Sequence, residues 1–322
     1  MYNEVSIIIS TYKRPDDLKI ALESILIQSV PPKEVIIVDD LNDLDVKEIV
    51  LKFKERECGM SFKYVHNIYG KSLTTARNIG AKYSTGDIIL FLDDDVILEP
   101  DFLRELTKVY SIIPNAKCVQ GKITNDYRFS PFWNKFYKIF LMWHQSDTYT
   151  VLASGKNTRT YQVNKLINCQ WATGANLSIK REIFEEFQFD EKLIKYCFGE
   201  DMDFSYRIYK KYPNGVLQTP YAKLIHNWSS ESRLPNLKLL IMEKTYTLYF
   251  ISKNMGSYKN YICFAWSELG ILLKKIIFLM RDPSRLKIKE LSFSLYSLFI
   301  CIQHFDSIKN LDIEKINKKY IE

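Results

Sequence analysis

Three consecutive aspartates, Asp93, Asp94 and Asp95, close the apolar segment DIILFL. Carboxylates grouped at the end of a buried strand are costly unless a positive charge compensates them. A hard divalent cation, Mg²⁺ or Mn²⁺, can do so, because one or two carboxylate oxygens hold it and the phosphate oxygens of a nucleotide complete its coordination. The alternative is an acidic turn that leads into the next helix. We favour the metal site.

Two other predicted strands also end in polar side chains. Thr11 and Tyr12 follow VSIIIS, and Asp39 and Asp40 stand at the end of EVIIVDD. The carboxyl ends of neighbouring parallel strands share one sheet edge, where ligands bind in such folds. A carboxylate there can accept a hydrogen bond from an N–H group of a nucleotide base. For Asp39 and Asp40 the alternative is turn chemistry leading into the polar segment LNDLD.

The segment KSLTTARNIGAKYSTGD predicts a helix that carries Arg77 and Asn78 toward the same sheet edge. An arginine beside a nucleotide can neutralise phosphate or contact the base. The alternative is a surface arginine in an ordinary ion pair. Arg14 follows the first strand in STYKRP, and we group it with the nucleotide-side residues.

A later pair of acids, Glu200 and Asp201, opens a helix in FGEDMDFSYRIYKKY. If the nucleotide carries a sugar, an acceptor hydroxyl can attack its anomeric carbon and invert the configuration there. One carboxylate must then take the proton of that hydroxyl. We predict Asp201 as this base, with Glu200 beside it. The competing interpretation is that acidic residues are simply favoured in the first turn of a helix.

His226 ends the apolar run in AKLIHNW. Histidine is a common metal or phosphate partner, although a single histidine at the end of an apolar run is also compatible with a packed core residue. We predict that His226 is a metal ligand together with Asp95.

The segments between these motifs predict the fold that positions them. Short apolar, β-branched runs alternate with helical periodicity from residue 5 to about 122, which is typical of a parallel sheet with crossover helices. Several runs are apolar throughout, as strands covered on both faces should be. We therefore predict an α/β fold with a doubly wound, mainly parallel sheet and flanking helices. The predicted strands are 5–10, 34–39, 61–65, 87–92 and 117–123, with helices from Asp16 to before Pro31 and over 46–57, 72–84 and 100–113.

The periodicity changes after residue 122, which predicts three regions. The first two are the halves of one domain, which we expect to hold the nucleotide site and an acceptor pocket, and the third is helical. Within the third, the apolar run 261–280 is interrupted by charges, which argues against a simple spanning helix. Segment 255–305 is compatible with peripheral membrane contact, with packing on the catalytic domain, or with a second subunit. The predicted boundaries are 1–122, 123–231 and 232–322.

Overall composition excludes few functions. The chain is 47% hydrophobic and 26% charged, which is ordinary for a globular protein, and 45 basic against 38 acidic residues give a net charge of +7. The amino terminus has no basic leader followed by a signal-type apolar region. We therefore expect a cytoplasmic protein, either free or peripheral on the inner face of the membrane, and no nucleic-acid partner.

Five motifs occur in an order that resembles the family 2 glycosyltransferases, which invert the anomeric configuration and have a GT-A type fold. The resemblance covers roughly residues 4 to 230. It implies metal-assisted transfer, with Mn²⁺ or Mg²⁺, of a sugar from a UDP, GDP or dTDP donor to a hydroxyl of a glycan or lipid-linked acceptor. The motifs are VSIIISTYKRP, EVIIVDD, TARNIGAKYSTGDIILFLDDDV, WATGANLSIKREIF and GEDMDFSYRI.

The resemblance also implies residue roles. Asp93 matches the nucleotide-side acid of a D-x-D motif, Asp95 its metal-binding acid, and Asp201 the general base. Ala175 stands where many members have a second glycine. The complete predicted set is Thr11, Tyr12, Arg14, Asp39, Asp40, Arg77, Asn78, Asp93 and Asp94 for the nucleotide sugar, Trp171, Gly174, Ala175 and Asn176 for the acceptor, Asp201 and Glu200 for catalysis, and Asp95 and His226 for the metal.

Two other functions compete with this prediction. A nucleotidyltransferase normally needs a glycine-rich phosphate loop after its first strand, and STYKRPDD has no glycine. A non-catalytic nucleotide-binding protein at a membrane surface or in an assembly would not need Glu200 and Asp201 opposite a metal site.

Overall fold

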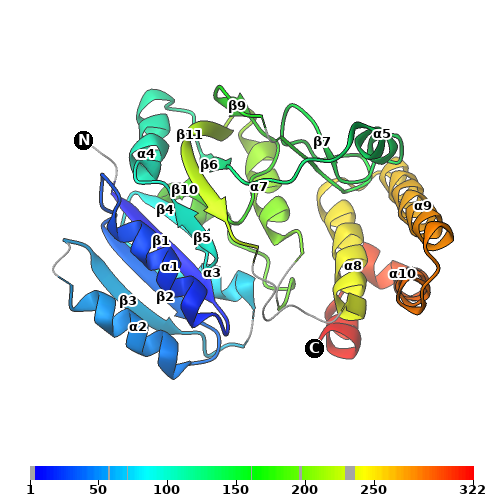
Figure 1. Cartoon of the computed structure of the whole chain (residues 1–322), viewed down its shortest axis with the longest axis horizontal. Helices are drawn as coiled ribbons and strands as arrows, with labels where there is room; N and C mark the ends of the chain where they lie inside the picture. The colour runs from blue at the N-terminus through cyan, green and yellow to red at the C-terminus, as the bar shows by residue number, and fades with distance from the viewer. Residues whose placement is uncertain (1–3, 57–58, 71, 161, 196–197, 229–235) are drawn as a thin grey trace. The chain divides into compact units, whose positions relative to one another are not determined.

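The computed structural model describes residues 4–56, 59–70, 72–160, 162–195, 198–228 and 236–322. Their contacts divide the chain into two units (Figure 1). In described residues, the first unit comprises 4–127, 162–195 and 200–228, and the second comprises 128–160, 198–199 and 236–322.

The first unit is built on one mixed sheet. Its strand order is β3-β2-β1-β4-β10-β6-β11-β5, and β9 pairs with β11. The neighbours among β1 to β4 are parallel, as are β6 and β11, whereas β10 runs antiparallel between β4 and β6. The strands are β1 Val5–Thr11, β2 Glu34–Asp39, β3 Ser61–His66, β4 Ile88–Asp93, β5 Val96–Leu98, β6 Cys118–Ile123, β9 Ile167–Asn168, β10 Asn176–Lys180 and β11 Val216–His226.

Helices cover both faces of this sheet because its strands are apolar on both sides. Ile7 and Ile9 belong to a core cluster that also contains Leu22 of α1 and Phe53 of α2. Ile8 points to the other face, where α3 packs so closely that a Cβ on Gly80 would lie 2.3 Å from its Cγ2 atom. The helices of this unit are α1 Pro15–Leu26, α2 Leu44–Lys54, α3 Leu73–Tyr83, α4 Phe102–Ile112, α6 Arg181–Glu186 and α7 Glu200–Lys211.

The predicted α/β class and mainly parallel sheet are confirmed. Strands β5 and β11 were not predicted, and further differences lie at element ends. Helix α2 begins at Leu44, earlier than predicted, because the side chain of Asp43 caps it by accepting a hydrogen bond from the backbone N–H of Asp45 at 2.9 Å. Helix α4 begins only at Phe102, so Pro100 lies before its first turn.

The second unit is mainly helical and also contains residues 128–160, which the sequence grouped with the acceptor-binding half. Aromatic rings join α5 to α9: Trp133 stacks on Phe278 at 5.2 Å between ring centres. No helix within the described ranges is both long and apolar enough to cross a membrane. The elements are α5 Pro131–Ile139, β7 His144–Gln145, β8 Thr158–Arg159, α8 Asn236–Asn254, α9 Tyr258–Arg281, α10 Arg285–Gln303, α11 Phe305–Lys309, α12 Glu314–Ile316 and a π-helix, η1, Asn317–Ile321.

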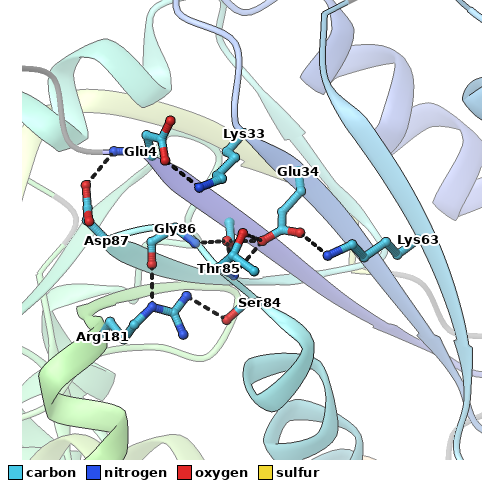
Figure 2. A network of polar contacts seen from close by, with 10 residues as sticks. Glu4, Lys33, Glu34, Lys63, Ser84, Thr85, Gly86, Asp87 and Arg181 are labelled. Atoms are coloured by element: carbon cyan, nitrogen blue, oxygen red, sulfur yellow. Dashed lines mark hydrogen bonds and ion pairs between the residues drawn. The ribbon is translucent and has the colours of Figure 1, made fainter.

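A polar network fixes the amino-terminal edge of the sheet in the first unit (Figure 2). Glu34, at the start of β2, accepts hydrogen bonds from Ser6 of β1 at 2.7 Å and from the backbone N–H of Thr85 at 2.6 Å, and it pairs with Lys63 of β3. Burial alone would raise the pKa of Glu34, but the hydrogen bonds from Lys63, Ser6 and Thr85 outweigh burial and lower it from 4.5 to about 2.

Glu34→Gln is expected to make the protein less sensitive to acid. Because the pKa of Glu34 is lower in the folded protein, its carboxylate stabilises the fold above pH 4.5, and this contribution is lost as the pH falls from 4.5 toward 2. We expect a loss of about 1–2 kcal/mol in the free energy of unfolding at pH 7, since solvent screens the half-exposed Lys63. Urea unfolding across this pH range measures it. Glu55→Gln, at an exposed position after α2, is the control, and equal pH profiles for Glu34→Gln and wild type would contradict the assignment.

Candidate active site

The aspartate triplet lies where β4 turns into β5, at the carboxyl edge of the sheet. Asp93 is the last residue of β4, and its N–H donates to the carbonyl of Ala175 at 3.4 Å. The short strand β5 pairs antiparallel with the end of β11, so that Val96 stands opposite His226. The backbone N–H of Asn227 also donates to the carbonyl of Asp95 at 2.9 Å. The pairing of β5 with β11 thus brings His226 to the triplet.

Asp93, Asp95 and His226 form a candidate metal centre. Each offers one ligand atom, and these atoms lie within 4.8 Å of one another. Nε2 of His226 lies 3.0 Å from Oδ1 of Asp95, while its buried Nδ1 has no hydrogen-bond partner among the residues described. Asn125 holds the backbone of His226 through two hydrogen bonds, at 2.8 and 3.0 Å. Two carboxylates and one imidazole are donors that Mn²⁺ accepts, so the side chains fit such an ion.

Asp94 points away from this group and ties two strand ends together. One carboxylate oxygen accepts a hydrogen bond from the Thr11 hydroxyl at 2.7 Å, and the other accepts one from Arg14 at 3.1 Å. Arg14 also lies 3.5 Å from Asp95. Burial raises the pKa of Asp94 to about 7, although Arg14 and Thr11 both lower it. Asp94, which the sequence grouped with the nucleotide-sugar residues, therefore connects the end of β1 to the triplet.

Arg77 connects the triplet to the acidic pair on α7. Its guanidinium donates to Asp93 at 3.0 Å and to Glu200 at 2.9 Å, and it lies 3.3 Å from the carbonyl oxygen of Gly174. The face of the guanidinium rests 5.3 Å from the centre of the Phe189 ring. Arg77 is only 2% exposed, so the alternative interpretation, a surface arginine in an ordinary ion pair, is excluded. Its position is that of a buried bridge between two acidic groups.

Asp201 stands in the first turn of α7, next to Glu200. Its Oδ2 atom accepts a hydrogen bond from the backbone N–H of Gly174 at 2.9 Å, and its Oδ1 atom accepts one from Met202 at 2.7 Å. Burial and then the adjacent Asp201 raise the pKa of Glu200, whereas Arg77 lowers it. Asp201 is only partly buried and Glu200 is 6% exposed. Asp201 is thus the member of the pair that solvent can reach.

The carboxylate of Asp39 stabilises the turn after β2 through hydrogen bonds. It accepts hydrogen bonds from the backbone N–H groups of Leu41 and Asp43, at 2.9 and 2.6 Å, and from the Tyr64 hydroxyl at 2.7 Å. A carboxylate offers about four acceptor positions, so one remains for a further donor. Asp40 accepts from Asn67 at 2.7 Å. The turn interpretation therefore describes the contacts of both residues, and nucleotide contact stays a prediction.

More than half of the chain matches the model of a known protein family. Residues 6–188 match the family model described as "Glycosyl transferase family 2". The chain belongs to this family. It is a glycosyltransferase, as its motifs predicted.

Two curated relatives of this glycosyltransferase are enzymes of glycan assembly. Glucosyl-dolichyl phosphate glucuronosyltransferase of Haloferax volcanii is 24% identical over 240 residues, which cover 69% of each chain. Chondroitin synthase of Escherichia coli is 23% identical over 231 residues, which cover 64% of this chain and 32% of the synthase.

Two solved structures share the fold, and the GT-A type architecture is thereby confirmed. One is the mannosyltransferase PcManGT from Pyrobaculum calidifontis in complex with GDP-Man and Mn²⁺, with a TM-score of 0.57, 15% identity and coverage of 93% of this chain and 87% of the other. The other is GalNAc-T7 with UDP, GalNAc and Mn²⁺, with a TM-score of 0.57, 18% identity and coverage of 88% and 58%.

The other predicted site residues are held by contacts within the protein or are buried. Asn78 is buried, and its amide holds the segment that carries Phe189, donating to the Phe189 carbonyl at 3.0 Å and accepting from the Phe189 N–H at 3.0 Å. Asn176 and Trp171 are also buried, at 0% and 1% exposure. Tyr12 is partly buried beside Lys13, whose ammonium lies 5.7 Å from its ring centre.

Trp228 is a neighbour of the site that the sequence did not predict. Its ring stacks on His226 with 4.0 Å between ring centres, and 42% of the residue is exposed. The aromatic residue two positions after the histidine in AKLIHNW was the available signal. Phe189 beneath Arg77 was also missed, and no local pattern marks it.

Arg77→Met is expected to destabilise the protein by about 3–5 kcal/mol, because it leaves Asp93 and Glu200 without their shared counter-charge. Equilibrium unfolding in urea measures this loss. The control is Arg104→Met, which removes a 46% exposed arginine of α4 that pairs with Asp101 just before the helix; we expect a loss below about 1 kcal/mol. Equal losses for the two variants would contradict the bridging role of Arg77.

Proposed function

We propose that this glycosyltransferase moves a sugar from a nucleotide diphosphate to an acceptor hydroxyl with inversion at the anomeric carbon. The observation that carries the proposal is the connection of two acidic groups through Arg77. Asp93 lies on one side of the guanidinium at 3.0 Å and Glu200 on the other at 2.9 Å. A group that binds the leaving diphosphate and a group that activates the acceptor are thereby held in one arrangement.

The proposed metal is Mn²⁺ or Mg²⁺, and the residues that would hold it are Asp93, Asp95 and His226. Two solved structures of the same fold are complexes with a nucleotide or nucleotide sugar and Mn²⁺, which supports this choice. A divalent ion at this position supplies positive charge to the leaving diphosphate. Asp94, Thr11 and Arg14 hold the turn that presents these ligands.

We assign the nucleotide to the carboxyl ends of β1, β2 and β4. Asp39 has an acceptor position left for an N–H group of the base, and Thr11, Tyr12, Arg14 and Asp40 surround the same edge. The proposed role of Arg77 and Asn78 is to position the site from within, since both are buried and bonded to protein groups. The donor base stays open among UDP, GDP and dTDP.

Asp201 is the proposed general base. One oxygen is oriented by the Gly174 N–H at 2.9 Å, and a carboxylate oxygen has further lone-pair positions that can accept the proton of a hydroxyl. Gly174, Ala175 and Asn176, with Trp171 before them, form the proposed acceptor side. A Cβ on Gly174 would lie 2.6 Å from a guanidinium nitrogen of Arg77, so the glycine permits the close approach of this segment.

The acceptor is proposed to be a glycan or a lipid-linked glycan. The name of the Haloferax volcanii relative includes a dolichyl phosphate-linked sugar, and chondroitin synthase is named for a polysaccharide, which supports either class. A panel of UDP-, GDP- and dTDP-sugars with Mn²⁺ or Mg²⁺, scored by release of the nucleoside diphosphate, tests the donor assignment. Absence of metal-stimulated release with every donor would contradict it.

Asp201→Asn is expected to keep donor binding and to lose transfer by about 10²–10⁴-fold, because the amide cannot take a proton but can still accept the Gly174 N–H. Calorimetric titration of the donor and initial rates of transfer measure the two properties on the same sample. Glu182→Gln, an exposed position on α6, is the control for charge removal. Substantial transfer by Asp201→Asn would remove this residue from the base role.

Peripheral membrane contact through 255–305 is the proposal that concerns the second unit. Helix α9 carries exposed apolar side chains along one face, each at least 36% exposed. Of the charged residues beside them, Glu268 is buried, and Lys274 and Lys275 are basic, which favours an anionic lipid surface over a charge-specified helical partner. The end of α9 and the first turns of α10 add basic residues that match anionic lipids. The apolar residues are Ile262, Leu269, Leu273, Ile276 and Met280, and the basic residues are Arg281, Arg285, Lys287 and Lys289.

The full chain is expected to float with vesicles that contain anionic lipid and to float less with neutral vesicles. Replacing Leu273 and Ile276 by Gln should reduce flotation, because each leucine- or isoleucine-sized side chain that enters the bilayer contributes about 1.5–3 kcal/mol. The control replaces Leu44 and Leu51, exposed apolar residues of α2 in the first unit. Equal flotation of both double variants and wild type would exclude contact through α9.

A further inference from the structure

A cavity of about 260 Å³ opens between α9 and α10 in the second unit. Basic side chains outnumber acidic ones in its wall, and apolar side chains form the rest. Three lysines face one glutamate, which gives an excess of two positive charges. We call it the basic cavity, and it is lined by Met142, Ile271, Lys274, Lys275, Phe278, Lys287 and Glu290.

Two of these lysines lack a close carboxylate partner in the described part of the chain. The ammonium of Lys275 donates to a neutral acceptor, the backbone carbonyl of Glu290, at 3.3 Å. The ammonium of Lys274 lies 4.8 Å from the centre of the Tyr137 ring and makes a cation–π contact. Lys287 differs, because it pairs with Asp282 at 2.5 Å. The excess charge of the basic cavity is therefore concentrated on Lys274 and Lys275.

The other buried charges of this unit show the opposite arrangement. Lys156 lies 3.0 Å from Glu243 and 3.3 Å from Glu268, and Lys244 pairs with Glu268. Two lysines thus meet two glutamates, as buried charges usually require. Lys275 instead carries a desolvation cost: burial lowers its pKa, although Glu290 raises it. An anion in the basic cavity would offset that cost.

The chemistry of the wall selects the anion. Lysine ammonium groups bind phosphate well as compact charges with several donors. Met142 and Phe278 give the same cavity an apolar wall that a free, strongly hydrated ion does not need. Exposed apolar residues also follow at the adjoining ends of the two helices: Met280 is 77% exposed and Leu286 is 62% exposed. A molecule with an anionic phosphate headgroup and apolar chains matches both the lysines and the apolar residues.

We propose that the basic cavity binds the phosphate group of an anionic lipid. Lys274 and Lys275 donate hydrogen bonds to the phosphate oxygens, Phe278 and Met142 contact the adjoining glycerol or alkyl carbons, and the chains lie along the exposed apolar residues of α9 and α10. The site deepens the membrane contact proposed for this unit, because it gives that contact a headgroup preference.

Calorimetric titration of the full chain with dioctanoyl phosphatidic acid, kept below its micelle concentration, tests the site. We expect binding of one lipid per chain, and at least about tenfold weaker binding of dioctanoyl phosphatidylcholine and of inorganic phosphate. Affinity for inorganic phosphate equal to that for the lipid would overturn the assignment to a lipid. Binding of many lipids per chain without saturation would overturn the existence of a defined site.

The double variant Lys274→Gln/Lys275→Gln should weaken the binding of phosphatidic acid by about tenfold or more, because two charge-assisted hydrogen bonds are lost. Lys275→Met retains the apolar stem and is expected to show a smaller loss in the same direction. The matched control is Lys309→Gln, which removes an exposed lysine of α11 that neither lines the cavity nor belongs to the proposed membrane-contact segment. Unchanged binding by the double variant, or an equal loss in the control, would overturn the proposal.

The same samples are assayed for release of nucleoside diphosphate from the donor. Neither lysine belongs to the proposed catalytic residues, so turnover is expected to stay at the wild-type value. Lost phosphate binding with normal turnover in the double variant supports the site. Absence of phosphatidic acid binding by a wild-type protein with normal turnover would overturn this proposal alone and leave the proposed transfer reaction intact.

Discussion

The active site depends on one buried guanidinium. Arg77 of α3 contacts the last residue of β4, the first residue of α7 and the segment before β10, and these elements are far apart in the sequence. Two carboxylates, on Asp93 and Glu200, share its charge, and within the described part of the chain neither pairs with another basic side chain. Because removing one partner of a buried ion pair leaves the other uncompensated, this geometry is strongly specified. Arg77 thus links Asp93, one of the proposed metal ligands, to Glu200, the neighbour of the proposed base.

The sheet could be predicted largely because its central strands are buried on both faces. Such strands appear as continuous apolar runs, and β1, β2 and β4 each follow that pattern. The antiparallel direction of β10 could not be predicted, since an apolar run is the same in both directions. The three-residue strand β5 is too short to show a period. Yet the pairing of β5 with β11 places His226 beside Asp95, so part of the site depends on a strand that the sequence pattern does not reveal.

The residues of the site were predictable as types, but their partners were not. Asp93, Asp95 and His226 were chosen for their chemistry, and the fold brings them together. Glu200 lies 123 positions from Arg77, and Asp94 lies 83 positions from Thr11, separations at which spacing carries no information about contact. The sequence therefore predicted direct ligand roles for Arg77 and Asn78, whereas both are bonded to protein groups in the interior. We propose that Arg77 and Asn78 position the site through the residues that they contact, Asp93, Glu200 and Phe189.

The central claim is that Asp93, which Arg77 joins to Glu200, belongs to a metal-dependent donor site together with Asp95 and His226. Crystals soaked with Mn²⁺ and a nucleoside diphosphate, with diffraction data collected at the manganese absorption edge, test it most directly. We predict one anomalous difference peak between Asp93, Asp95 and His226, next to the diphosphate, with the contacts of Arg77 to Asp93 and Glu200 preserved. A bound nucleotide with the manganese peak elsewhere, or a guanidinium that leaves Glu200 to contact the phosphate, would contradict the account.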